Sequence, residues 1–281
     1  MLDTHNETVY SAAPALSQPV RFFQDALSDL KGSLYLAFIL LQRDIKHQYR
    51  QSLFGLFWAL LPPLVMTFAF SLLKRQNLIA ADDIGVHYEA YVLTGTLLWQ
   101  GFADAVANPV KAVNGGKAMF GKVNFPREAI LFAGLGEVVF YFAIRFLMVI
   151  LLLLVFQVPL SVSAMILVGV GAIIGLGWAI GLWLVPVGVL YKDVEMATGI
   201  VLSLWYFATP VIYTTALHNP LPAVLSLNPV APLIVFTRAG LLEGRALMTE
   251  TVLLIILLTL VAIFCGWLLF RLSIPHIVKR V

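Results

Sequence analysis

The stretch Phe146-LMVILLLLVFQVPLSVSAMILVGVGAIIGLGWAIGLWLVPVGVL-Tyr191 decides the fold, because it runs for 46 residues without a charged side chain. As one helix it would measure about 69 Å at about 1.5 Å per residue, roughly twice the hydrocarbon thickness of a bilayer. The chain must therefore turn, and Gln157–Ser163, which contains Pro159, is where we expect the turn. The stretch predicts two membrane-spanning helices, at Arg127–Phe156 and Ala164–Leu190.

The composition of the whole chain also indicates a membrane protein. Of 281 residues, 60% are hydrophobic and only 12% are charged, whereas soluble proteins have about 45–50% apolar and about 25% charged residues. So few charges cannot cover the surface of a soluble body, which excludes a soluble enzyme and a nucleic-acid-binding module. The net charge of +3 comes from Lys and Arg residues distributed by membrane side, so no nucleic-acid partner is expected.

Four more stretches are apolar and long enough to cross a membrane. They are Leu53–Leu73, Tyr88–Asn108, Met196–Leu217 and Thr251–Phe270. All six together predict an all-α membrane protein with six transmembrane helices and both termini on one side. Most of the 18 Lys and Arg residues fall in segments on that side. The positive-inside rule therefore places both termini in the cytoplasm and the protein in the inner (cytoplasmic) membrane.

A cytoplasmic segment, residues 1–52, precedes the six-span domain, residues 53–281. Between Phe23 and Ile45 apolar side chains recur every three or four residues, which predicts one helical stripe with the charged residues off it. This pattern is typical of an amphipathic helix that lies in the membrane interface, and we expect a break near Gly32. The alternative is a helix that packs on its own bundle.

The segment His218–Glu250, between the fifth and sixth spans, is apolar yet rich in proline. Irregular backbone at membrane depth is tolerated only where it is buried in protein or lines a cavity. We therefore expect two short re-entrant helices, about Leu221–Ser226 and Ala231–Leu242, that dip into the outer leaflet. An ordinary extracytoplasmic loop is the alternative.

Ionisable residues inside the expected spans are few, and such residues are functional candidates by default. Asp104 and Glu137 fall in the inner half of their spans, and Arg145 falls toward the outer end of its span. By depth, Glu89 is the expected partner of Arg145. We interpret these charges as structural ion pairs, and their scarcity argues against a proton- or sodium-coupled carrier.

Aromatic residues predict a pathway for a sugar polymer. Trp205, Tyr206 and Phe207 lie in mid-span, where an interfacial anchor has no role. Sugar C–H faces pack on aromatic rings, and a tyrosine adds a polar hydroxyl to the ring. Of these three, we expect Trp205 or Phe207 to face lipid or neighbouring helices. The alternative is that none of the aromatic residues lines a pathway and that all of them face lipid or pack between helices. The expected lining residues are Phe54, Trp58, Tyr206, Thr209 and Tyr213.

No complete nucleotide or metal site is predicted. Gly116–Val123 approaches a P-loop pattern, but Val123 stands where a Ser or Thr must bind magnesium, and no strand precedes it. The acidic pair Asp82-Asp83 has no His or Cys beside it. We expect a transport subunit that is not an enzyme, binds no cofactor or metal, and takes its energy from elsewhere.

Several motifs, in order along most of the chain, resemble those of ABC-2 type permeases of the polysaccharide-export subgroup, which export O-antigen, capsule or teichoic acid. One departure is Phe54-Gly55, where the subgroup usually has Leu-Gly. The motifs are R-D-x-K-x-x-Y-x-x-S…G-x-x-W-x-x-x-P over Arg43–Pro62, K-V-N-F-P-R over Lys122–Arg127, Y-K-D-V over Tyr191–Val194, F-A-T-P-V-I-Y over Phe207–Tyr213, and L-N-P over Leu227–Pro229, followed by Arg238.

The resemblance implies half of a transporter. A homodimer would form the channel, two copies of a separate ABC ATPase that uses ATP and Mg would dock below it, and the cargo would be a polyprenyl-linked glycan surrounded by membrane lipid. Phe54 and Gly55 would gate the entrance, and short helices carrying Asn228, Pro229 and Arg238 would form the outer gate. The implied ATPase-docking residues are Arg43, Asp44, Lys46, Tyr49 and Arg50 in the amphipathic helix, and Lys122, Phe125, Pro126 and Arg127 in the loop before the third span.

The expected function is thus the transmembrane half of an ATP-driven exporter of a polysaccharide such as O-antigen, capsule or teichoic acid. One alternative is an ABC-2 permease for a small lipophilic drug or a lipid, which would have a narrower and less aromatic pathway. Another is a membrane-embedded glycan-processing enzyme, which would need a carboxylate cluster at the membrane face. A passive channel is disfavoured by the docking-like motifs.

Overall fold

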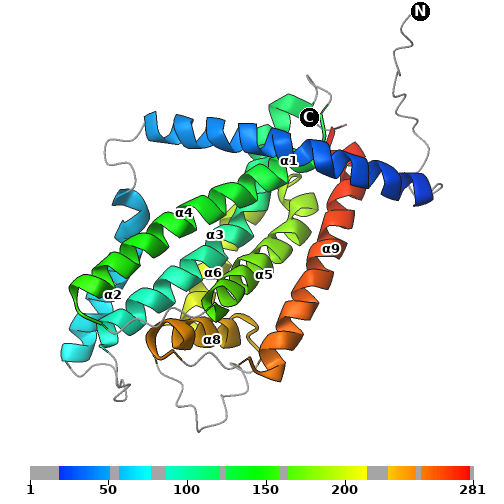
Figure 1. Cartoon of the computed structure of the whole chain (residues 1–281). Coiled ribbons are helices and arrows are strands. Elements are labelled where there is room, and N and C mark those ends of the chain that lie inside the picture. Colours follow the sequence, from blue (N-terminus) through cyan, green and yellow to red (C-terminus); the bar gives the residue numbers. More distant parts are fainter. Residues whose placement is uncertain are drawn as a thin grey trace, which may run out of the picture.

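The computed structural model describes residues 19–50, 57–76, 87–120, 125–158, 164–213, 227–244 and 248–278. Over these residues the chain is helical and contains no strand (Figure 1). The helices are α1 (Pro19–Arg50), α2 (Phe57–Arg75), α3 (Tyr88–Phe120), α4 (Glu128–Val155), α5 (Met165–Gly188), α6 (Asp193–Phe207), α8 (Val230–Leu242) and α9 (Glu250–Val278).

Three of the described helices are long and apolar enough to cross a membrane by length and composition. They are α4 (Glu128–Val155), α5 (Met165–Gly188) and, within α9, the stretch Glu250–Ile274. The first two confirm the helices predicted from the uncharged 46-residue stretch. Gln157 follows α4 with a φ of 55°, a left-handed conformation that stops the helix at the expected turn.

Figure 1 shows α1 lying crosswise over one end of the bundle and α8 lying across the opposite end. We call these the α1 end and the α8 end. Between them α3 is the central helix, since it packs on α2, α4, α5, α6 and α8. Its side chains Leu97, Leu98 and Phe102 are almost completely buried. Helix α5 packs between α3 and α9, and α1 packs on α4.

Two glycines of α5 explain how closely α5 approaches α3. A Cβ added at Gly177 would lie 2.5 Å from the Phe102 carbonyl oxygen, and one at Gly181 would lie 2.5 Å from the Val106 carbonyl oxygen. Because backbone atoms cannot move away as a flexible side chain can, only glycine fits at both positions. This is the small-residue packing that membrane helices use for close contact.

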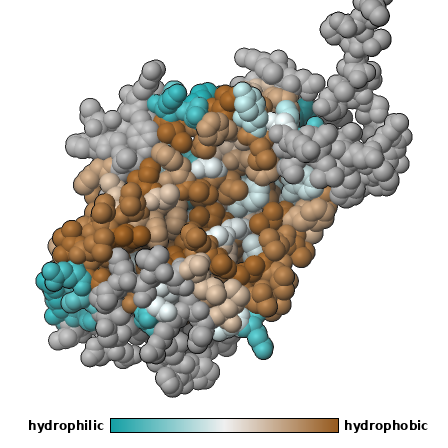
Figure 2. All heavy atoms as spheres, viewed as in Figure 1, coloured by the Kyte–Doolittle hydropathy of each residue, from teal (hydrophilic) through white to brown (hydrophobic). Residues whose placement is uncertain are grey.

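The outside of the bundle is strongly apolar. Figure 2 shows a broad hydrophobic region over the helix faces, with hydrophilic residues gathered at the α1 end and at the opposite end. Helix α9, for example, exposes a row of large apolar side chains, including Leu254, Leu258 and Val261. In water such a surface would drive aggregation, whereas hydrocarbon accommodates it.

Three sequence-based boundaries are wrong. Helix α1 runs unbroken through Gly32, where an added Cβ would lie 3.5 Å from Pro126 Cγ, an ordinary van der Waals distance. Helix α3 does not end at Asn108 but continues past Pro109 to Phe120. Helix α6 ends at Phe207, shortly before Pro210, and not at Leu217.

The predicted helix Ala231–Leu242 is present as α8. The other predicted short helix, Leu221–Ser226, lies outside the described residues, as do the side chains of Phe54, Gly55, Tyr49, Arg50 and Lys122.

Candidate functional site

The loop before α4 lies against α1. Phe125, Pro126 and Arg127 are partly exposed and lead directly into the first turn of α4, whose N-cap is Arg127. The contact between Pro126 and Gly32 brings this loop against the amphipathic helix. Two of the segments implied to dock an ATPase are therefore neighbours, although they are far apart in the sequence.

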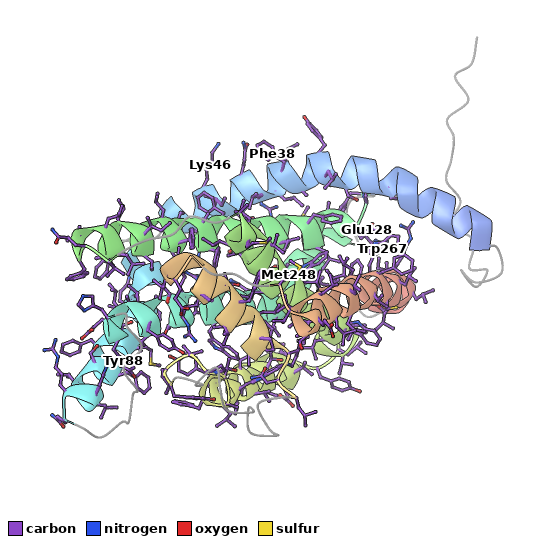
Figure 3. The ribbon with its side chains drawn as sticks, turned by 60° about the horizontal axis from the view of Figure 1, so that its bottom comes forward. Phe38, Lys46, Tyr88, Glu128, Met248 and Trp267 are labelled. Atoms are coloured by element: carbon purple, nitrogen blue, oxygen red, sulfur yellow. The ribbon has the colours of Figure 1, made fainter. Side chains whose placement is uncertain are left out.

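The motif residues of α1 that the structure describes are accessible. Arg43 and Asp44 form an exposed ion pair, with 2.8 Å between Arg43 Nη2 and Asp44 Oδ1, and Arg43 Nη1 also lies 3.7 Å from Met119 Sδ of α3. Lys46 is exposed and points away from the bundle, as does Phe38 (Figure 3).

Helix α1 packs on the bundle and still exposes apolar side chains. Its face toward α4 carries Ser33, Ala37 and Leu40, which are buried at spacings of four and three residues. Its outer face exposes Tyr35 and Phe38. The two readings of this helix, interfacial and bundle-packed, are therefore compatible, because different faces serve each role.

Arg271 of α9 joins three helices at the α1 end. Its Nη2 donates to Asp29 Oδ2 of α1 at 2.6 Å, and its Nη1 donates to Glu128 Oε1 of α4 at 2.8 Å. The Glu128 side chain is 5% exposed and that of Arg271 is 12% exposed, so water screens this contact only weakly. The predicted sixth span ends at Phe270, one residue before Arg271, but α9 continues to Val278 and holds Arg271 in the bundle.

A second ion pair joins α3 to α4 inside the bundle. Arg145 Nη1 lies 2.6 Å from Asp104 Oδ2, and Gln100 Nε2 donates to the other carboxylate oxygen of Asp104 at 3.1 Å. The prediction that Glu89 pairs with Arg145 is wrong, since Glu89 Oε1 lies 3.7 Å from Arg75 Nη2 of α2.

The length of α3 explains why Arg145 pairs with Asp104 and not with Glu89. Because α3 continues to Phe120, Asp104 lies 16 residues before its end, and Arg145 lies 17 residues after the start of the antiparallel α4 at Glu128. The two charges therefore come level. An estimate of depth that ended the helix at Asn108 set Asp104 too close to the inner surface.

At the α8 end, Arg238 holds three segments together. This residue of α8 is 5% exposed. Its Nη2 donates to the Tyr91 hydroxyl of α3 and to the Pro210 carbonyl at 3.0 Å, and its Nη1 donates to the Val211 carbonyl at 3.4 Å. The guanidinium also lies over the Tyr91 ring, 3.4 Å from its centroid.

Asn228 fixes the start of α8 beside the end of α6. Its Oδ1 accepts from the Val230 N–H at 3.0 Å, and its Nδ2 donates to Thr209 Oγ1 at 2.9 Å and to the Ala208 carbonyl at 3.2 Å. Pro229, the next residue, is the N-cap of α8. The three residues that the motif implied for the outer gate thus belong to one polar junction between α3, α6 and α8.

The predicted lining residues that the structure describes differ in exposure in the single chain. Tyr206 is buried and pairs with Thr96 of α3, with 3.1 Å between the two hydroxyl oxygens, and Thr209 is fully buried. Trp58 of α2, in contrast, is 57% exposed, and Phe207 is 55% exposed. Tyr206, Thr209 and Tyr213 do not share one helical face, because α6 ends at Phe207.

Trp205 turns toward neighbouring helices, one of the two orientations expected for it. Its ring centroid lies 5.4 Å from that of Phe102 and 6.2 Å from that of Trp99, both in edge-to-face contact.

In the part of the chain that the structure describes, no three His, Cys, Asp or Glu side chains gather as metal ligands.

An all-helical bundle with an apolar exterior, interhelical ion pairs and charges at its two ends is the build of a membrane protein. Comparison with curated proteins gives its relatives. The chain is 27% identical to the O-antigen export system permease protein RfbA of Myxococcus xanthus over 216 residues, which are 73% of this chain and 80% of that protein. It is 22% identical to RfbA of Klebsiella pneumoniae over 217 residues, 74% of this chain and 81% of that protein.

No family model matches the chain. The relatives nevertheless confirm the resemblance to ABC-2 type permeases of the polysaccharide-export subgroup, which the motifs had indicated. All are named as permeases, that is, as transport subunits.

Proposed function

We propose that this chain is the transmembrane half of an ATP-driven ABC exporter that moves a polysaccharide such as O-antigen, capsule or teichoic acid across the inner membrane. The observation that carries the proposal is the similarity to O-antigen export permeases over about four-fifths of their length. Some motif residues also lie at junctions between helices: Thr209, Asn228 and Arg238 at the junction of α3, α6 and α8, and Pro126 beside α1.

The proposed topology has six crossings, made by α2, α3, α4, α5, α6 with the turns after it, and α9. Helix α8 has 13 residues, about 20 Å of helix, too short for a hydrocarbon core of about 30 Å. Its burial and its place across one end of the bundle support a re-entrant helix at the outer side. The α1 end, where α9 also ends, is the proposed cytoplasmic side, and the lysine and arginine distribution supports this orientation.

The proposed partner at the α1 end is an ABC ATPase in two copies, which bind ATP and Mg. The exposed Arg43, Asp44 and Lys46, together with the loop Phe125–Arg127, offer it a charged surface on two adjoining segments. Tyr49, Arg50 and Lys122 extend the same two segments in the sequence.

We propose that two copies of the chain enclose the pathway. Helices α2 and α6 both pack on α3 and expose large apolar side chains, including Trp58, Phe68 and Phe207. Trp58 would line the pathway with the gate residues Phe54 and Gly55. Tyr206, Thr209 and Tyr213 reach it only if the outer part of α6 turns away from α3, because the first two are buried in the single chain.

The test is export by the reconstituted complex. Vesicles that contain this chain, its ATPase and a polyprenyl-linked glycan should move the glycan to the far side when ATP is added, where a lectin detects it. A labelled lipid and a small lipophilic dye serve as competing cargoes. ATP-driven movement of the dye or lipid without movement of the glycan would favour the alternative permease function.

A matched experiment addresses the alternative of a glycan-processing enzyme. Replacing both Asp82 and Asp83 by Ala removes the acidic pair that such an enzyme would need. We expect cells with this variant to display the normal amount and chain length of surface glycan. Shortened or chemically altered glycan would support the enzyme instead.

A further inference from the structure

A cavity of about 220 Å³ opens at the α1 end, between α1, α3 and α4. Small residues form part of its lining. Gly116 and Gly134 lie where an added Cβ would clash with Ile130 and Asn108, so these two glycines let α3 and α4 approach each other. Gly115 differs, because a Cβ there would meet no atom within 4 Å. Its open side is space that a ligand can occupy.

The cavity is lined by two cations and two carboxylates. Arg43 and Asp44 pair with each other at its rim, at 2.8 Å. Lys111 of α3 and Glu137 of α4 line the same cavity, and within the described residues neither takes part in a hydrogen bond or ion pair. They also do not pair with each other. An unpaired ammonium and an unpaired carboxylate beside one cavity suit a ligand that carries both a negative and a positive group.

The surroundings indicate which ligand carries these groups. Helix α1 covers this end of the bundle and exposes Tyr35 and Phe38. Figure 3 shows Phe38 pointing away from the bundle. A helix of this kind lies at the boundary between headgroups and acyl chains. The cavity beside it therefore opens at the depth of lipid headgroups.

We propose that this cavity binds the headgroup of a zwitterionic phospholipid with a primary amine, of the phosphatidylethanolamine class. Lys111 would bind the phosphate as a point charge, and Glu137 would accept hydrogen bonds from the ammonium. A choline headgroup carries no N–H and cannot donate to Glu137, and a glycerol headgroup lacks the positive charge. This proposal does not depend on which cargo is exported. It rests on the proposed placement of α1 in the membrane interface.

Three variants test the site in the complete transporter complex. Gly115→Leu fills the cavity without a clash at Cβ, Glu137→Gln removes the partner of the ammonium, and Lys111→Gln removes the partner of the phosphate. Gly171→Leu on α5 is the matched control, because a Cβ there also meets no atom within 4 Å. The complexes are reconstituted in nanodiscs of dioleoyl phosphatidylethanolamine, phosphatidylcholine and phosphatidylglycerol, and native mass spectrometry counts the lipids that each retains. Free glycerophosphoethanolamine, added as a competitor, distinguishes the headgroup from the acyl chains.

Wild type and Gly171→Leu should retain phosphatidylethanolamine in preference to the other two lipids, and glycerophosphoethanolamine should displace it. Loss of one charged hydrogen-bond partner should weaken retention by about tenfold in Glu137→Gln and Lys111→Gln, and Gly115→Leu should abolish it. Equal retention of phosphatidylglycerol, unaffected by Glu137→Gln, would overturn the proposal in favour of a simple anion site. Loss of the ATPase from Gly115→Leu with unchanged lipid retention would overturn it in favour of a protein-docking pocket.

Discussion

Single buried charges have the largest effects at the residue scale, and Asp104 with Arg145 is the clearest case. Arg145 Nε is buried without a hydrogen-bond partner, so Asp104 is the main compensation for this guanidinium in the described part of the chain. Asp104→Asn should lower the free energy of unfolding by about 3–5 kcal/mol, because it leaves a buried charge unpaired. Thermal unfolding of the purified protein in detergent measures the change.

The double variant Asp104→Asn with Arg145→Met separates the charge from the packing. If the pair is structural, the double variant should unfold within about 1.5 kcal/mol of the wild type and should still export, since an apolar replacement of similar shape often restores stability. Restored stability with lost export would show instead that the pair takes part in transport.

Arg238 is the second case at this scale. Its planar guanidinium reaches two backbone carbonyls and the Tyr91 hydroxyl at once, a geometry that a lysine ammonium cannot reproduce. Arg238→Lys should cost about 1.5–3 kcal/mol in the free energy of unfolding, whereas the same change at the exposed Arg75 should cost less than about 1 kcal/mol. Equal effects at both positions would contradict the anchoring role of Arg238.

At the element scale, the question is what holds α1 on the bundle. Besides its packing on α4, α1 is tied through Asp29 to Arg271 of α9, which also binds Glu128 of α4. Arg271→Gln should loosen α1 and weaken the link between the docking segments and the spans. We expect faster amide hydrogen exchange in α1 and an increase in ATP hydrolysed per glycan exported.

Arg43→Gln is the matched control for this prediction, because the ion pair of Arg43 is with the exposed Asp44 on its own helix, and its contact with α3 is a 3.7 Å contact with Met119 Sδ that carries no opposite charge. It should leave amide exchange in α1 unchanged. Normal exchange in Arg271→Gln would mean that packing on α4 alone holds the helix.

At the scale of the whole molecule, assembly with the ATPase depends on the α1 end. Arg127 is partly exposed next to α1 and supplies a positive charge to the proposed docking surface. Arg127→Glu should reduce co-purification of the ATPase by reversing that charge, and should leave membrane insertion intact. Arg75→Glu, which makes the same change at the opposite end of the bundle, should leave the complex intact. Normal assembly of Arg127→Glu would move the docking surface elsewhere.

Much of the architecture could be predicted from the sequence because membrane helices are defined by local composition. Uncharged stretches of sufficient length produced α4 and α5 almost to the residue, and apolar periodicity indicated α1. Proline and apolar residues together indicated α8. Hydrocarbon requires each backbone polar group to be satisfied within its own helix, so these elements need little information from distant residues.

The tertiary structure alone decided which side chains meet. Arg145 pairs with Asp104 and not with Glu89, because α3 runs on past Pro109 and shifts its register against α4. Arg271 binds α1 and α4 at once, because α9 continues beyond its apolar stretch. Tyr206 turns into the bundle, because α6 packs on α3. Hydrophobic length sets where a helix can cross, but the contacts between charges depend on helix ends and relative depth, which only packing determines.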